Sequence, residues 1–240
     1  QTAVANHGAV TNITTGTVRG NNAFNSFSTF NVAQGQTANL FLPNGTLNLI
    51  NLVRDQRTTI EGILNSIKDG KIGGNVYFAN PHGFLVSASG VVNVGSLNLS
   101  TPTPAFIDSF FSAPGNPNDA SVASLLNGTA PRSGSGLISV LGQINAIDGI
   151  ALSAGAINVG GSLYAGARFV GSAPNFTDVV NANGLASATN VVVREGRIEI
   201  VADGDVSVSG TIAAPGGSGV RGGDVSIRAG GNVDLQNGAL

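Results

Sequence analysis

Short strands broken by tight turns fill the stretch from Asn75 to Thr101 and constrain the fold more than any other feature. Alternation at period two places apolar side chains on one face of each strand. The connections are too short for crossover helices, so the pattern predicts a chain wound coil upon coil as a β-solenoid. The alternating apolar pairs are Val76/Phe78, Phe84/Val86, Val92/Val94 and Leu97/Leu99.

The turns between these strands have their own chemistry. Pro81 presets the backbone for the first position of a turn, and Gly83 can adopt a positive φ where a side chain would clash. The Asn80 side chain can accept a hydrogen bond from the backbone two residues further on, which makes a rigid corner. The expected corners are Asn80-Pro81-His82-Gly83, Ser89-Gly90 and Gly95-Ser96.

A repeat near the end of the chain supports stacked coils. Placing Gly196 on Gly223, an offset of 27 residues, aligns apolar positions that lie two apart, as strands stacked in register require. The matched pairs are Ile198/Val225, Ile200/Ile227, Ala202/Ala229, Gly204/Gly231, Val206/Val233 and Val208/Leu235.

The composition fits a narrow core with glycine corners. The 240 residues include 35 Gly and 42% hydrophobic residues but only 10% charged ones, and no apolar run is long enough for a membrane helix. The net charge is −2 and the basic residues are dispersed along the chain, so the sequence gives no support for nucleic-acid binding. The absence of Cys is compatible with passage through an oxidising periplasm. The chain begins at Gln1 without a signal sequence, so we expect that one was removed or lies outside this sequence.

Two segments interrupt the strand pattern. In residues 58–68 apolar residues fall at helical spacing, and Thr58 with Glu61 matches a capping box, which predicts a short helix; an extended segment is the alternative. Residues 102–135 contain five prolines and form a predicted excursion from the solenoid, with helices expected over Thr103–Phe111 and Asn118–Asn127. We expect the phenylalanines of the excursion to pack it down rather than form an exposed contact surface.

Catalytic chemistry has little support. His7 and His82 lie in Gly-rich corners without metal-ligand spacing, and we interpret them as solvent-facing turn residues. The most suggestive acids are Asp203 and Asp205, with Glu195 and Glu199 nearby, because β-helix enzymes that cleave polysaccharides place paired carboxylates on a solenoid face. The alternative interpretation is that Asp203 and Asp205 belong to an ordinary turn and that Glu199 forms a weak surface ion pair with Arg228 on the next coil. We predict no enzyme activity, no cofactor and no metal site.

Two stretches carry a family resemblance. Asn80-Pro81-His82-Gly83-Phe84, with the strands after it, looks like the Asn-Pro-Asn-Gly-Ile signature of two-partner-secretion domains, the N-terminal domains of filamentous-haemagglutinin-like adhesins and haemolysins. The upstream stretch Phe24–Gly35 resembles the F-x-x-F-x-V-x-x-G segment of that family. His82 and Phe84 depart from the signature, and the family's Asn-Pro-Asn-Leu signature has no clean counterpart, which indicates a divergent subgroup.

The resemblance implies a single secretion domain over residues 1–240, the N-terminal part of a longer exoprotein. The expected fold is all-β, a right-handed parallel β-helix with an N-terminal cap, excursions and one or two short helices. The implied partner is an outer-membrane β-barrel transporter with periplasmic POTRA domains, and the implied secretion motif is Asn80, Pro81, His82, Gly83 and Phe84. The protein would be a secreted or surface-exposed monomer that reaches the outside through the periplasm. The alternatives are an adhesive module that binds a host receptor or matrix polysaccharide through residues 102–135, and a carbohydrate-active enzyme.

Overall fold

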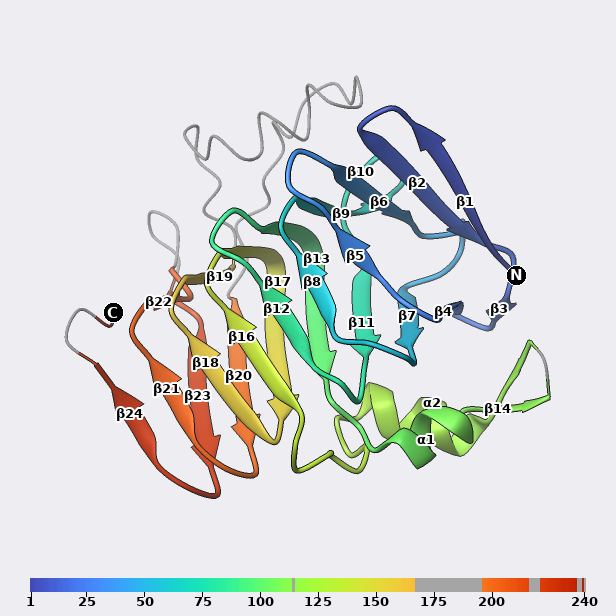
Figure 1. The fold of residues 1–240 in the computed structure, drawn as a ribbon. Coiled ribbons are helices and arrows are strands. Elements are labelled where there is room, and N and C mark those ends of the chain that lie inside the picture. The colour runs from blue at the N-terminus through green and yellow to red at the C-terminus, as the bar shows by residue number, and fades with distance from the viewer. Residues whose placement is uncertain (114, 167–195, 216–220, 237–238, 240) are drawn as a thin grey trace.

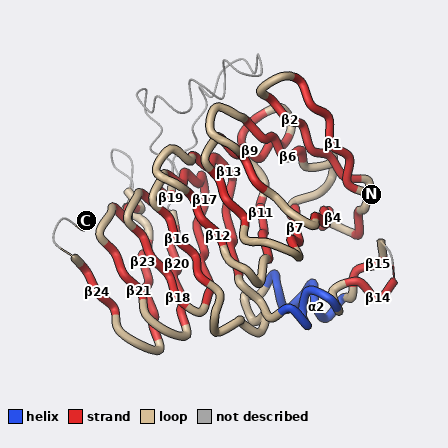
Figure 2. The backbone as a smooth tube through the Cα atoms, viewed as in Figure 1, coloured by secondary structure: helices blue, strands red, loops and turns tan. Residues whose placement is uncertain are grey.

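The chain winds into a stack of coils whose strands line up into parallel sheet faces (Figure 1). The computed structural model describes residues 1–113, 115–166, 196–215, 221–236 and 239. Strands dominate the described residues, and the helices lie to one side of the stack (Figure 2). The predicted parallel β-helix is confirmed.

Three rows of parallel strands make up the solenoid, and we call them the first, second and third face. The first face contains β2 (Val10–Thr15), β6 (Thr37–Phe41), β9 (Ile63–Lys68), the beginnings of β13 (Val91–Ser100) and β17 (Gln143–Ala154), β19 (Ser162–Ala165) and β22 (Thr211–Ala213). The second face contains β4 (Asn22–Phe27), β7 (Asn48–Val53), β11 (Asn75–Ala79), the ends of β13 and β17, β20 (Arg197–Ala202) and β23 (Asp224–Ala229). The third face contains β5 (Asn31–Val32), β8 (Thr58–Ile60), β12 (Phe84–Val86), β16 (Leu137–Val140), β18 (Ala156–Val159), β21 (Val206–Val208) and β24 (Val233–Leu235).

The predicted register of the last coils is confirmed. Ile198 pairs with Val225 and Ile200 with Ile227 across β20 and β23, at the expected offset of 27 residues. The pairing continues between β21 and β24, where Val206 lies beside Val233. Like side chains therefore stack on like side chains from coil to coil.

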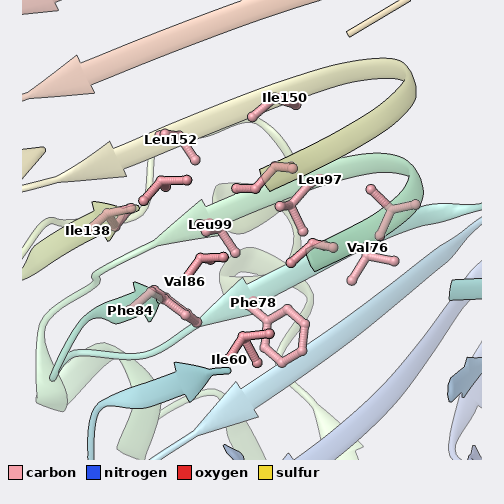
Figure 3. Close-up of a cluster of buried hydrophobic side chains, with 14 of the residues drawn as sticks. Ile60, Val76, Phe78, Phe84, Val86, Leu97, Leu99, Ile138, Ile150 and Leu152 are labelled. Atoms are coloured by element: carbon pink, nitrogen blue, oxygen red, sulfur yellow. The ribbon is translucent and has the colours of Figure 1, made fainter. Parts of the chain in front are cut away.

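The inward-facing side chains form one narrow apolar core along the solenoid axis (Figure 3). The alternation predicted for Asn75–Thr101 is what fills it, because each strand contributes every second side chain. β13 passes from the first face to the second with a register shift between Val94 and Ser96. Gly95 lies at that bend, where a Cβ would come within 2.5 Å of the Gly74 backbone. The predicted inward residues are all buried, namely Val76, Phe78, Phe84, Val86, Val92, Val94, Leu97 and Leu99.

Antiparallel strands cover the N-terminal end. β1 (Thr2–His7) pairs with β2, and β3 (Val18–Arg19) pairs with β4. A further short strand, β10 (Lys71–Ile72), pairs with β9. Because β1 and β3 hydrogen-bond to strands that would otherwise lie at a sheet edge, they protect the solenoid from edge-to-edge pairing. The predicted N-terminal cap is present.

The predicted excursion contains two helices, α1 (Pro104–Asp108) and α2 (Asp119–Leu126), joined through β14 (Phe111–Ala113) and β15 (Asn116–Pro117). Thr103 caps α1 by accepting a hydrogen bond from the Phe106 amide, and Asn118 caps α2 in the same way through the Ala120 and Ser121 amides. Gly128 follows α2 with φ +68°, as expected for the residue that ends a helix.

The helix predicted over residues 58–68 is wrong. The segment forms β8 and β9, with Gly62 at the corner between them. The helical spacing of the apolar residues arises because Ile60 and Leu64 face the core while Ile67 is buried on the opposite face of β9. At Gly62 a Cβ would lie 2.2 Å from the Gln36 carbonyl oxygen, so the neighbouring coil leaves room only for glycine. Pairing with β6 and β13 on both sides satisfies the backbone of β9 and outweighs a local helix preference.

Candidate functional site

The corner between β11 and β12 holds the predicted motif, and we call residues 80–83 the signature corner. The Gly83 amide donates a hydrogen bond to the Asn80 carbonyl oxygen at 3.1 Å, which closes a four-residue turn. The Asn80 side-chain oxygen accepts a hydrogen bond from the His82 amide at 2.9 Å. The hydrogen bond from the backbone to the Asn80 side chain, which the sequence predicts, is therefore present in the structure.

The signature corner also holds the loop of the preceding coil, which connects β7 to β8. The Asn80 side-chain nitrogen Nδ2 donates to the Gln56 carbonyl oxygen at 2.8 Å and to the Thr58 hydroxyl oxygen at 3.0 Å. The His82 ring Nε2 donates to the Arg54 carbonyl oxygen at 2.9 Å. The Thr58 amide in turn donates to the Gly83 carbonyl oxygen at 3.1 Å. Two successive coils are joined here by four hydrogen bonds.

The other side of the corner lies against the following coil. Gly83 has φ +91°, and a Cβ on it would lie 2.2 Å from the Leu137 carbonyl oxygen. Asn80 is fully buried and Phe84 is 3% exposed, whereas His82 is exposed. Most of the motif is therefore hidden in the folded domain.

The two stretches that carry the family resemblance meet in the core. Phe30, from the upstream stretch, packs on Phe78, with ring centroids 5.1 Å apart. Phe78 in turn contacts Phe84 of the motif at 6.0 Å, and Phe27 contacts Phe30 at 5.0 Å. The Phe78 and Phe84 rings lie beside each other in Figure 3. These aromatic residues form a continuous cluster that links the second and third faces.

Rows of asparagine side chains, which the sequence reasoning missed, join successive coils. The longest row crosses the first face on the side opposite to the core and consists of Asn12, Asn39, Asn65, Asn93 and Asn145. Each amide nitrogen donates to the side-chain oxygen of the preceding coil at 2.9–3.0 Å. The last four members of the row are at most 1% exposed. The first four asparagines recur every 26–28 residues, a sequence signal that could have revealed this row, whereas Asn145 follows Asn93 after 52 residues.

The acidic residues considered for catalysis are engaged in structural contacts. One oxygen of Asp203 accepts hydrogen bonds from Arg132 Nε at 2.8 Å and Nη2 at 2.5 Å. Asp205 accepts a hydrogen bond from the Asn232 amide at 2.7 Å. Glu199 lies 3.4 Å from Arg228 on the next coil, which confirms the predicted pair. The fourth acid considered, Glu195, lies outside the described residues.

The described part of the chain contains no cluster of side chains that could bind a metal ion. No group of three or more His, Cys, Asp or Glu side chains gathers there. His7 is exposed on β1, far along the chain from the exposed His82 of the signature corner. Among the described helices, none has the length and apolar character needed to cross a bilayer.

Comparison with known proteins connects this fold to one family. The sequence model of a family described as the TPS secretion domain matches residues 1–239. Among solved structures, the HMW1 secretion domain from Haemophilus influenzae aligns with a TM-score of 0.48 and 18% sequence identity. That alignment covers 100% of this chain and 70% of the other. No curated protein matches the chain.

Proposed function

The chain belongs to the TPS secretion-domain family, and we propose that it is the N-terminal secretion domain of a larger bacterial surface adhesin. In this role an outer-membrane transporter with POTRA domains recognises the domain in the periplasm. The folded domain then starts β-helix formation outside the cell. The family match over residues 1–239 is the observation that carries the proposal.

The last described coil carries apolar side chains on its open side. Val225, Val233 and Leu235 are 46%, 47% and 63% exposed. Their partners one coil earlier are nearly or fully buried, at 0–2% exposed. Another coil in the same register would bury these side chains and pair with the edges of β23 and β24. Because each coil mainly contacts its neighbours, such growth needs no energy source beyond folding itself.

Burial of the signature corner supports recognition of the unfolded chain. Asn80 and Phe84 have almost no accessible surface in the folded domain. A transporter domain can reach them only while the segment is extended. An extended chain with alternating apolar residues can add as a strand to the edge of a partner sheet. We therefore propose that the POTRA domains bind this segment before the solenoid forms.

The adhesive and enzymatic alternatives gain no observation in their favour. Of the aromatic residues of the excursion that would offer a receptor surface, Phe106 at 9% and Phe110 at 0% exposure are buried, and Phe111 is partly buried against the same cluster. The acids that would flank a glycosidic bond are held by Arg132, Arg228 and the Asn232 amide.

An export assay with a matched control tests the proposed role of the corner. Asn80→Ala combined with Pro81→Ala should reduce the amount of domain outside the cell and weaken capture of the urea-unfolded chain by isolated POTRA domains. The control is Pro43→Ala combined with Asn44→Ala in the turn between β6 and β7, which is closed by a hydrogen bond from the Thr46 amide to the Pro43 carbonyl oxygen. Both double variants loosen one turn, but the first also removes the Asn80 hydrogen bonds to Gln56 and Thr58. Capture of the urea-unfolded chain, in which no coil is formed, therefore isolates the contribution of the motif. Equal export and equal capture of the two variants would show that the motif has no secretion role.

A further inference from the structure

The outer side of the second face changes character along the solenoid. One row across it runs through Phe24, Ile50 and Tyr77 in the first coils and continues with Asn98 on β13. The neighbouring row begins with the exposed Ser26 on β4 and continues with the apolar residues Leu52 and Ala79 on β7 and β11. Further along, the same two rows carry mostly polar side chains, namely Ser100, Ala151, Ser153, Glu199, Val201, Ser226 and Arg228. Among the described strands of the second face, those of the coils of β4, β7 and β11 carry the large apolar side chains on the outward side.

The excursion covers this apolar part, and we call its described residues between 102 and 135 the strap. A second hydrophobic cluster forms where α1 and α2 lie on the outer side of β4, β7 and β11. The Phe24 ring lies 6.3 Å from the Phe110 ring and 6.5 Å from the Phe111 ring. The strap contributes to this cluster the side chains Phe106, Ile107, Phe110, Val122, Leu125 and Ala130.

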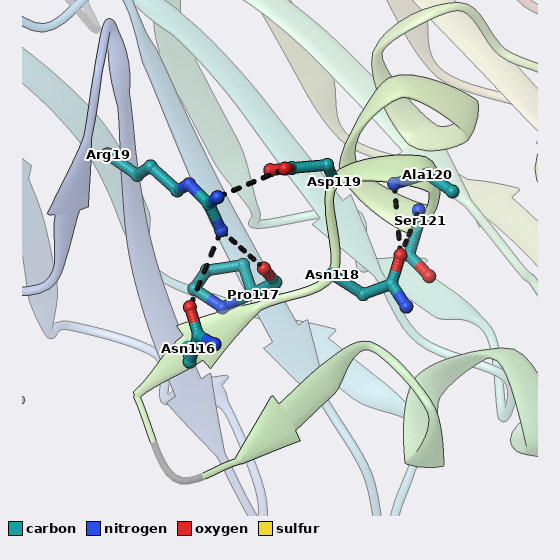
Figure 4. A network of polar contacts seen from close by, with 7 residues as sticks. All are labelled: Arg19, Asn116, Pro117, Asn118, Asp119, Ala120 and Ser121. Atoms are coloured by element: carbon teal, nitrogen blue, oxygen red, sulfur yellow. Dashed lines mark hydrogen bonds and ion pairs between the residues drawn. The ribbon is translucent and has the colours of Figure 1, made fainter.

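Polar contacts hold the strap at its middle and near its C-terminal end. Arg19, on the cap strand β3, donates to the Asp119 carboxylate at 3.0 Å and to the Pro117 carbonyl oxygen at 2.9 Å (Figure 4). Near the C-terminal end of the strap, Arg132 binds Asp203 of a late coil. The partners are 100 and 71 residues apart in the chain. The exposed Arg19–Asp119 pair adds little stability alone, but it places α2 against the cap.

These contacts bear on the order in which the parts of the domain fold. Until the strap is in place, Phe24, Ile50 and Leu52 would lie together on an exposed sheet face, which soluble proteins avoid. The residues that cover them follow β7 by more than fifty positions in the chain. We infer that the first coils become stable only when the strap docks, so that the strap acts as a late lock on the N-terminal part of the solenoid.

The consequence for export rests on the proposed function. In a chain that is exported with its N-terminus first, the first coils would stay unlocked until the strap had crossed the outer membrane. The early segments, including the signature corner, would then remain available in extended form. The folding claim itself needs no transporter and can fail or succeed separately from the secretion role.

Pulse-labelled hydrogen exchange during refolding of the full 240-residue chain from urea tests the lock. We expect β4 and β7 to gain amide protection in the same kinetic phase as α1 and α2. Phe110→Ala should lower protection of β4 and β7 by roughly tenfold or more, with a much smaller loss in β20 and β23. The matched control is Ile200→Ala, which removes a fully buried side chain from a late coil and should weaken β20 and β23 instead.

Two results would overturn the inference. One is protection of β4 and β7 before the strap is protected in the parent chain. The other is a loss of protection in Phe110→Ala that is equal in every coil. If Phe110→Ala does not fold, Val122→Ala makes a smaller deletion in α2, and the same localised loss is expected at a smaller size. Export measured with intact cells is a separate readout, so a failed lock leaves the secretion role untouched.

Discussion

Gly83 offers the sharpest test of how successive coils fit together. Its φ of +91° lies in the region that residues with side chains avoid, so Gly83→Ala introduces backbone strain of about 1–2 kcal/mol. The new Cβ would also lie 2.2 Å from the Leu137 carbonyl oxygen, whereas ordinary contact begins at 3.4 Å. Relieving that overlap must move one coil against the other, and overpacking of this kind costs about 1–3 kcal/mol. We expect the free energy of unfolding to fall by about 2–5 kcal/mol.

Urea unfolding followed by far-ultraviolet circular dichroism measures this loss. The matched control is Gly45→Ala, because Gly45 has φ +78° but no atom lies within 4 Å of its built Cβ. That variant should lose only the strain, about 1–2 kcal/mol. The difference between the two variants isolates the overlap between coils. If Gly83→Ala loses no more stability than Gly45→Ala, the argument that Leu137 requires a glycine at position 83 is refuted.

Two further variants test the polar rows and the outer face. Asn93→Ala removes the hydrogen-bond partners of the Asn65 side-chain oxygen and the Asn145 side-chain nitrogen. Two buried polar groups are then unpaired, so the free energy of unfolding measured in urea should fall by about 2–5 kcal/mol. The control Asn98→Ala, at a half-buried position, should change this free energy little. Burial raises the pKa of the Tyr77 hydroxyl above its usual value near 10, so the folded state holds this proton more tightly than the unfolded state. This contribution to the free energy of unfolding is fully present below about pH 10 and is lost as the pH rises through the folded pKa. Tyr77→Phe should therefore reduce the fall in the free energy of unfolding at alkaline pH. An unchanged fall in this variant would contradict the role of Tyr77.

Local chemistry was readable from the sequence. The turn at Asn80–Gly83 follows from an asparagine side chain, a proline with fixed φ and a glycine that tolerates positive φ. The ends of α2 follow from Asn118 and Gly128 in the same way. The register of β20 with β23 was also readable, because two nearly identical alternations stand 27 residues apart. In each case the deciding interactions lie within a few residues or repeat at one spacing.

The segment 58–68 shows where local patterns stop being decisive. Apolar residues at helical spacing also suit two short strands that meet at a glycine corner, and eleven residues cannot distinguish these. The backbone of β9 pairs with β6 on one side and β13 on the other, and neither partner is close in the chain. The choice of strand was made by those neighbours.

The sequence by itself determined the turn at Asn80–Gly83, the alternation of side chains from Asn75 to Thr101 and the repeat of the last coil, because these depend on φ preferences and on spacing. Only the tertiary structure decided that the outer side of β4 and β7 is covered, and that Arg19 meets Asp119 a hundred residues later. The sequence of β7 carries apolar residues on both faces of the strand, which indicates that its outer side is also buried. It does not indicate which segment of the chain covers that side. The covering segment is selected by many packing contacts between surfaces that are far apart in the chain and meet only after the coils have stacked. Local sequence preferences do not contain this information.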